Sequence, residues 1–199
     1  MNFLFHLFLS GDDPAILTGN FMGDFVKGRL DNRYPESLRH GLMLHRRIDS
    51  FAHHDPVYRQ SRQRLSVDYG LYRGVLVDLF YDHFLVAEWD RWSEESFDSY
   101  LTRVRKLVEL HHPFLPSRLQ DLLPVIFSQL LPSYGEVAGI GAALDRMSRR
   151  LKRPNPLSGG EGELVRHYDL LRDDFRFFMP KARLFASAFI AAGNDTERT

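Results

Sequence analysis

Apolar residues recur along most of the chain at the three- and four-residue spacing of amphipathic helices. Asp13-Pro14 and Asp55-Pro56 are typical helix starts, because aspartate caps the first turn and proline suits its first position. No alternating strand pattern of useful length and no internal repeat is found. We therefore predict an all-α fold, with helices over 14–25, 35–52, 56–65, 69–89, 97–110, 117–131, 134–149 and 163–192.

Three details qualify these helices. Ser93 is expected to cap the helix that starts at 97, Pro124 to interrupt the one over 117–131, and Pro180 to kink the last one. The segment RLKRPNPLSGGEG, starting at residue 150 and ending at 162, holds prolines, glycines and basic residues, which indicates a mobile basic surface loop between helices. The length of 199 residues suits a single helical domain over 1–199.

The stretch VDLFYDHFL, residues 77–85, combines an apolar helix with ionisable groups. Its apolar residues surround nearly the whole helix, as in an element that is buried on most sides. Asp78, Asp82 and His83 interrupt this pattern. Because an unpaired buried charge costs several kcal/mol, these groups must be paired, bound to a metal or turned toward a water-filled cleft.

The same combination of acids, amides and histidines recurs earlier in the chain. His6 lies in NFLFHLFL, and three pairs stand four residues apart: Asn20 with Asp24, His45 with Asp49, and Asp78 with Asp82. Side chains at this spacing leave one helix face with Cβ atoms about 5–6 Å apart, so one metal ion can bridge them. The chain has no cysteine, so ligands would be nitrogen and oxygen, which suit Mn, Mg, Fe or Zn.

A metal ion of this kind activates water and neutralises charge on a phosphoryl group, and Arg46, Arg47 and Lys27 are near enough in sequence to hold phosphate oxygens. A structural interpretation also exists. His6 alone suits a hydrogen-bonded core histidine, and an exposed pair of His45 and Asp49 would contribute only about 0.3–0.5 kcal/mol. From the residues alone, a metal-assisted hydrolytic site and a network of structural ion pairs both stay open.

Composition excludes several functional classes. With 26 basic and 26 acidic residues, the formal net charge is zero, which gives no general attraction to nucleic acid or membranes. The absence of cysteine excludes disulfides and a cysteine nucleophile, and no G-x-S-x-G motif supports a serine nucleophile. No apolar run approaches the ~20 residues that span a bilayer. We expect a soluble cytoplasmic protein with neither nucleic acid nor membrane as partner.

Four motifs occur in an order and at a spacing that resemble a known family. They are MNFLFHLFLS, GNFMGDFVKG, HRRIDSF and DLFYDHFL, all within the first 90 residues, and they resemble the bacterial acyl carrier protein phosphodiesterases. The resemblance implies an all-helical bundle related to the HD-domain metal-dependent phosphohydrolases. It also implies hydrolysis of holo-acyl carrier protein to 4′-phosphopantetheine and apo-carrier, with Mn²⁺ as the usual cofactor and Mg²⁺, Fe²⁺ or Zn²⁺ as alternatives.

The resemblance makes Asp24, His45, Asp49, Asp78, Asp82 and His83 site candidates, with His6 and Asn20 behind them. We assign the expected roles from the chemistry of the reaction that the resemblance implies. The expected metal ligands are His45, Asp49, Asp78 and Asp82, with Asp24 as a further ligand or general base. His83 is expected as a general acid or a supporting group, and Arg46 or Arg47 as the phosphate-binding cation. The supporting residues are His6, Asn20 and Lys27.

The substrate implied by the resemblance also predicts a docking surface. Acyl carrier proteins are acidic, so a basic surface should receive them. The densest basic cluster in the chain comprises Arg146, Arg149, Arg150, Lys152 and Arg153. Two alternatives stay open: an HD-like phosphohydrolase that acts on a nucleotide or another small phosphate ester, and a non-catalytic helical module that binds the carrier.

Overall fold

The computed structural model describes the backbone of residues 3–30 and 32–196 and the side chains through residue 193. All regular secondary structure in these ranges is helical, which confirms the predicted all-α class. The α-helices are α1 (Phe3–Phe8), α2 (Pro14–Phe21), α3 (Glu36–His54), α4 (Pro56–Arg64), α5 (Arg73–Ala87), α6 (Trp89–Trp92), α7 (Phe97–Glu109), α8 (Ser117–Val125), α9 (Leu131–Ser133), α10 (Val137–Arg150), α11 (Glu161–Arg166) and α12 (Tyr168–Thr196). Short 3₁₀ helices are η1 (Gly23–Phe25), η2 (Val67–Tyr72) and η3 (His112–Phe114), and η4 (Ile126–Leu130) is a π-helix.

The predicted aspartate caps are confirmed. Asp13 accepts hydrogen bonds from the first backbone N–H groups of α2, and Asp55 does the same for α4. Ser93 was the wrong cap for α7, because the hydroxyl of Ser96 accepts the N–H of Ser99. The last predicted helix is two helices, since the chain leaves helical geometry at His167 between α11 and α12.

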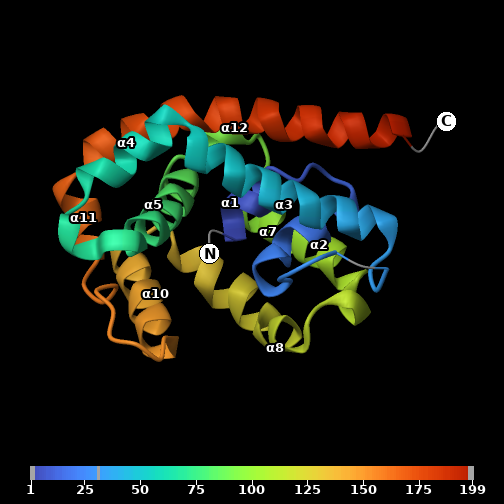
Figure 1. Ribbon diagram of the computed structural model, residues 1–199, viewed down its shortest axis with the longest axis horizontal. Helices are drawn as coiled ribbons and strands as arrows, with labels where there is room; N and C mark the ends of the chain where they lie inside the picture. The colour runs from blue at the N-terminus through green and yellow to red at the C-terminus, as the bar shows by residue number, and fades with distance from the viewer. Residues whose placement is uncertain (1–2, 31, 197–199) are drawn as a thin grey trace.

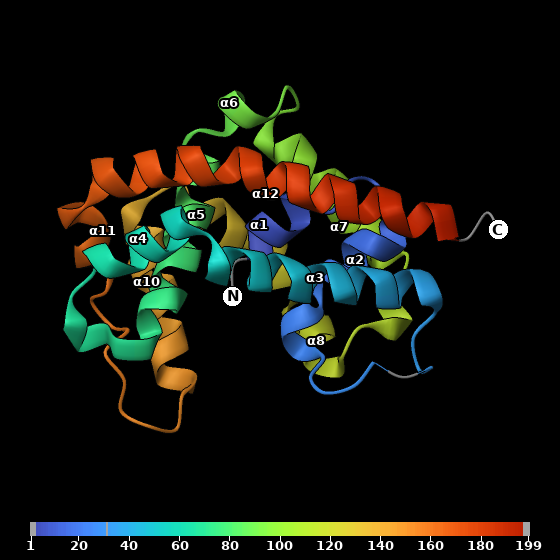
Figure 2. The same cartoon turned by 45° about the horizontal axis from the view of Figure 1, so that its top comes forward.

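The helices α3 and α12 run side by side along one side of the molecule, as both views show (Figure 1 and Figure 2). Beneath them, α2 packs on α3 at very close range. A Cβ atom added to Gly19 would lie 2.3 Å from the carbonyl oxygen of Leu38, and one added to Gly41 would lie 2.2 Å from that of Ile16. Only glycine permits this approach, which brings the polar face of α3 against the end of α2.

The helix α5 carries the stretch VDLFYDHFL and is buried on most sides, as its apolar pattern predicts. It contacts α1, a helix that the periodicity did not predict. One cluster of buried apolar side chains extends from Phe3 in α1 to Ala186 in α12. Two buried helices, α1 and α5, thus form the support on which the polar site is built.

The helix α8 passes directly into the π-helix η4. The N–H of Leu131 donates to the carbonyl oxygen of Ile126, five residues earlier, and Pro132 follows without an N–H of its own. The interruption predicted near Pro124 is therefore a change of helix type rather than a break. π-Helical segments are frequent at functional sites.

The basic loop between α10 and α11 is attached to the rest of the structure. Leu157 is buried, and the Asn155 side chain donates to the carbonyl oxygen of Ser148. Across the described ranges, none of the helices combines the length and hydropathy needed to cross a bilayer.

Candidate metal centre

His6, His45 and Asp49 converge where α1, α2 and α3 meet. The Nε2 atom of His6 lies 3.2 Å from Oδ1 of Asp49, and Nε2 of His45 lies 3.4 Å from Oδ2 of the same carboxylate. The two imidazole rings stack with centroids 3.9 Å apart. Both histidines are buried, whereas the Asp49 side chain is 58% exposed, so the cluster opens to solvent through this carboxylate.

Asn20 fixes the orientation of both rings. Its Nδ2 donates to the carbonyl oxygen of His6 and to the Ser10 hydroxyl, which leaves its Oδ1 to accept from Nδ1 of His6. The backbone carbonyl of Asn20 accepts from Nδ1 of His45. Each ring therefore carries its hydrogen on Nδ1 when neutral, and both Nε2 lone pairs face Asp49.

Two lone pairs beside a carboxylate repel one another unless a positive charge lies between them. Within the described ranges, Nε2 of His6 is buried and has no hydrogen-bond partner. The three ligand atoms of His6, His45 and Asp49 all lie within 4.8 Å of one another. Such an unsatisfied buried nitrogen and this donor set fit a divalent cation, because bound histidines typically have the other ring nitrogen held by a second group.

The charges of the cluster are coupled. Burial alone would lower the pKa of His6, but the Asp49 and Asp24 carboxylates raise it above its usual value. Burial, followed by the charge of His6, lowers the pKa of His45 to about 4. Burial opposes ionisation of Asp49, yet the neighbouring His6 and His45 lower its pKa. The carboxylates thus favour positive charge beside the two imidazoles, which is the kind of charge that a bound cation would supply.

Asp24 and Asp78 lie at the same cleft. Asp24 Oδ1 is 3.9 Å from Nε2 of His45, and its side chain is 27% exposed. A cavity of about 270 Å³, called here the acidic cleft, is lined by Asp24, Asp49 and Asp78 together with Tyr58. The Tyr58 hydroxyl donates to Asp78 over 2.6 Å, and burial raises the pKa of Asp78. The structure therefore brings together His6, Asn20, Asp24, His45 and Asp49, with Asp78 across the cleft.

Asp82 and His83 do not join this cluster, contrary to the sequence-based prediction. Both Asp82 oxygens are occupied, because they accept the backbone N–H groups of Leu4 and Phe5 at the start of α1. Asp82 thus stabilises the helix that carries His6. In His83, Nδ1 donates to the carbonyl oxygen of Tyr134 and Nε2 lies 3.1 Å from the hydroxyl of Tyr168, so both nitrogens are engaged elsewhere.

The predicted phosphate-binding arginines also lie elsewhere. Arg46 donates to the carbonyl oxygens of Gly28 and Val26, so it stabilises the segment that follows Asp24. Arg47 lines a different cavity beside Phe51 and Phe185, whose lining includes none of the three cluster residues. Lys27 is exposed and lies 3.6 Å from Asp24, where it balances part of the acidic charge.

Two residues of the site, Gly23 and Tyr58, were not predicted from the sequence. A Cβ atom on Gly23 would lie 2.1 Å from Cγ of His45, so the imidazole packs directly on this glycine. The only signal was the glycine beside Asp24 in GNFMGDFVKG. Tyr58 has no local motif, since it meets Asp78 across 20 residues.

Of the basic residues predicted to dock a carrier, Arg146 and Arg150 project from α10 and line a second cavity. Arg149 is exposed at the end of α10, and Lys152 and Arg153 are exposed in the following loop. The five residues therefore divide between a cavity wall and an open surface, and their role in docking stays a prediction.

Comparison with known proteins identifies relatives over nearly the whole chain. The sequence profile described as acyl carrier protein phosphodiesterase matches residues 1–182. A protein of Yersinia pestis named acyl carrier protein phosphodiesterase is 32% identical over 182 residues, covering 90% of this chain and 94% of its own. Proteins of the same name from Photorhabdus laumondii (32% identity, 84% of this chain and 86% of its own) and Serratia proteamaculans (30%, 91% and 95%) match similarly.

No solved structure gives a significant match, so the relation to HD-domain hydrolases stays a prediction. The profile match over residues 1–182 and the identity of these relatives agree with the four motifs quoted above. The chain belongs to the acyl carrier protein phosphodiesterase family.

Proposed function

We propose that the protein is a metal-dependent phosphodiesterase that removes 4′-phosphopantetheine from holo-acyl carrier protein. The family and the names of its relatives support the substrate. The observation that carries the chemistry is the pair of Nε2 lone pairs that face Asp49. His6, His45 and Asp49 would hold the cation, for which Mn²⁺ is our first expectation. When bound, the cation supplies a Lewis acid that makes water more acidic and balances phosphoryl charge.

In the reaction, a water oxygen forms a bond to phosphorus while the bond from phosphorus to the carrier's serine oxygen breaks. The water loses a proton and the serine oxygen gains one. Asp24 is partly exposed beside His45, and we assign it the role of general base. Asp78 faces the same cavity, and burial raises its pKa. We therefore assign it the role of general acid, which gives a proton to the leaving serine oxygen.

The assignment is tested with chelated protein and holo-acyl carrier protein, with Mn²⁺, Mg²⁺ or Zn²⁺ restored one at a time. The expected result is loss of the phosphopantetheine mass from the carrier only when a metal is present. Absence of turnover with every metal, by protein that circular dichroism shows to be folded, would overturn the proposal. Activity confined to small phosphate esters would instead support the HD-like alternative.

A further inference from the structure

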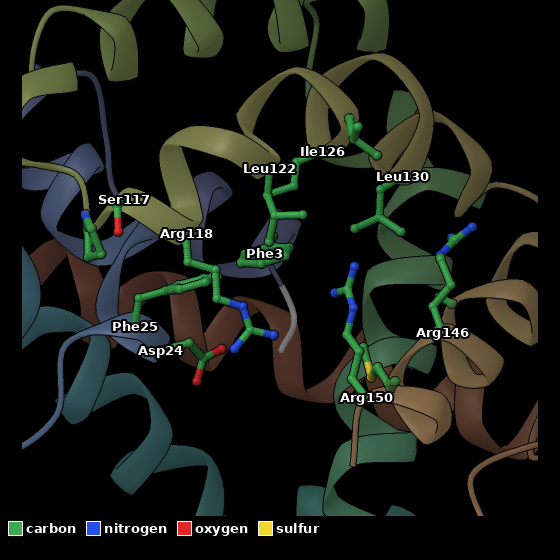
Figure 3. Close-up of a pocket in the computed structure, with 14 residues that line it drawn as sticks. Phe3, Asp24, Phe25, Ser117, Arg118, Leu122, Ile126, Leu130, Arg146 and Arg150 are labelled. Carbon is green, nitrogen blue, oxygen red and sulfur yellow. The ribbon is translucent and has the colours of Figure 1, made fainter. Parts of the chain in front are cut away.

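A second cavity, of about 380 Å³, lies beside the metal cluster and shares Asp24 with the acidic cleft. One wall comes from α8 and η4, which supply Leu122, Ile126 and Leu130, and another from α10. Phe3 and Phe25 close the side nearest Asp24 (Figure 3). The cavity is thus an apolar compartment that adjoins the proposed site of hydrolysis.

Three arginines interrupt this apolar lining: Arg118, Arg146 and Arg150. Arg118 extends toward Asp24, Arg150 projects between the two walls, and Arg146 lies beside Leu130 (Figure 3). Three cations and the single acid Asp24 give the lining a formal charge of +2.

Throughout the described ranges, none of these three guanidinium groups forms an ion pair or a hydrogen bond with another residue. Other arginines are paired, as in Arg64 with Asp174, Arg103 with Glu95 and Arg176 with Glu88. Unpaired guanidinium groups around an apolar cavity fit a ligand that has carbonyl or phosphate oxygens as well as hydrocarbon.

We infer that this cavity, defined here as the arginine pocket, binds the pantetheine arm of the substrate and retains 4′-phosphopantetheine after cleavage. The inference rests on the proposed function. With its phosphate at Asp24, the arm can extend directly into the adjoining pocket. The branched methyl carbons of the arm would pack on Phe25, Leu122 and Ile126. Arg118 and Arg150 would donate to its phosphate and amide oxygens, and the +2 lining suits the dianionic product.

The direct test is calorimetric titration of 4′-phosphopantetheine, pantetheine and inorganic phosphate into chelated protein, which needs no turnover. The variants are Arg150→Gln, which removes a cation, and Met147→Trp, which fills the pocket from α10. Arg149→Gln is the matched control, because Arg149 neighbours Arg150 on α10 but does not line the pocket.

We expect 4′-phosphopantetheine to bind at least about tenfold more tightly than inorganic phosphate, and Arg150→Gln to weaken it by about tenfold or more. Arg149→Gln should leave the affinity for 4′-phosphopantetheine unchanged. Equal affinity for phosphate and 4′-phosphopantetheine, or equal effects of the two arginine substitutions, would overturn the inference. If Met147→Trp does not fold, the two arginine variants still decide the question.

Turnover of holo-carrier by the same proteins separates this inference from the proposed function. If wild-type protein cleaves holo-carrier while Arg150→Gln and Met147→Trp keep its KM, the pocket assignment fails and the function stands. If 4′-phosphopantetheine binds as expected but holo-carrier is not cleaved, the function fails and the pocket stands.

Discussion

The acidic cleft and the arginine pocket share Asp24 but satisfy their polar groups in opposite ways. In the cleft, Asn20 orients both histidines, and their free nitrogens face one carboxylate. In the pocket, the guanidinium groups lack protein partners within the part of the chain that the structure describes. A rigid, partly satisfied donor set suits a small cation, whereas free cations on flexible side chains suit a longer anionic ligand.

Asp49→Asn should produce the largest effect, because it removes the negative charge that both histidines face. Loss of a supporting partner of a metal ligand typically costs 10–100-fold, so loss of this shared carboxylate should lower metal-dependent turnover by at least about 100-fold. Initial rates on holo-carrier at saturating metal measure this effect. Nearly wild-type rates from the folded variant would show that Asp49 is not a metal ligand.

Gly23→Ala should disturb the cleft without removing any polar group. The added Cβ would overlap the ring of His45, which must move away from Asp49. We expect turnover to fall by about 10–100-fold, with a parallel loss of metal affinity. Gly162→Ala is the matched control, because a Cβ atom there has nothing within 4 Å. Similar rates for the two variants would contradict the contact between Gly23 and His45.

Asp82→Asn should show whether Asp82 only stabilises α1, the helix that carries His6, or also binds the metal. An amide replaces one acceptor oxygen by a donor, so one N–H of α1 loses its partner and the free energy of unfolding should fall by about 1–3 kcal/mol. Urea denaturation measures this change, and the metal affinity of the folded variant should stay close to that of wild type. Loss of metal binding at unchanged stability would restore Asp82 as a ligand.

The carboxyl group of Asp82 should also make the free energy of unfolding depend on pH. Burial raises the pKa of Asp82 from 3.8 to about 7. The folded state therefore binds this proton more tightly than the unfolded state, so the contribution of Asp82 is greatest below pH 4 and declines as the pH rises to about 7. The charge of His6 also acts on Asp82, so the comparison is wild type minus Asp82→Asn. A difference in unfolding free energy that is constant between pH 5 and 8 would contradict this assignment.

Removing the exposed charges of Lys152 and Arg153 should have the smallest effect. Both lie outside the arginine pocket, so their attraction to an acidic carrier would act mainly on the association rate. We expect KM for holo-carrier to rise by only a few-fold at low salt, and this difference to disappear near 1 M salt, where the Debye length is about 3 Å. An effect that persists at high salt would point to direct contacts instead.

The fold could be predicted from the sequence because its signals are local. Helical periodicity and the caps Asp13 and Asp55 act within a few residues, and the structure confirms them. The pairing of His45 with Asp49 was equally local, since both lie one turn apart on α3. Asp82 escaped prediction because its partners in α1 lie 77 and 78 residues away. The arginine pocket escaped it because its walls come from separate elements.

Metal binding by His6, His45 and Asp49 is tested most directly by titrating metal-free protein with Mn²⁺ and following the titration by electron paramagnetic resonance. The proteins to compare are wild type, Asp49→Asn and Asp82→Asn. We predict that wild type binds Mn²⁺, that Asp82→Asn retains this site and that Asp49→Asn weakens its affinity by at least about 100-fold. Folded wild-type protein that binds no Mn²⁺, or binding that Asp49→Asn leaves intact, would contradict this prediction.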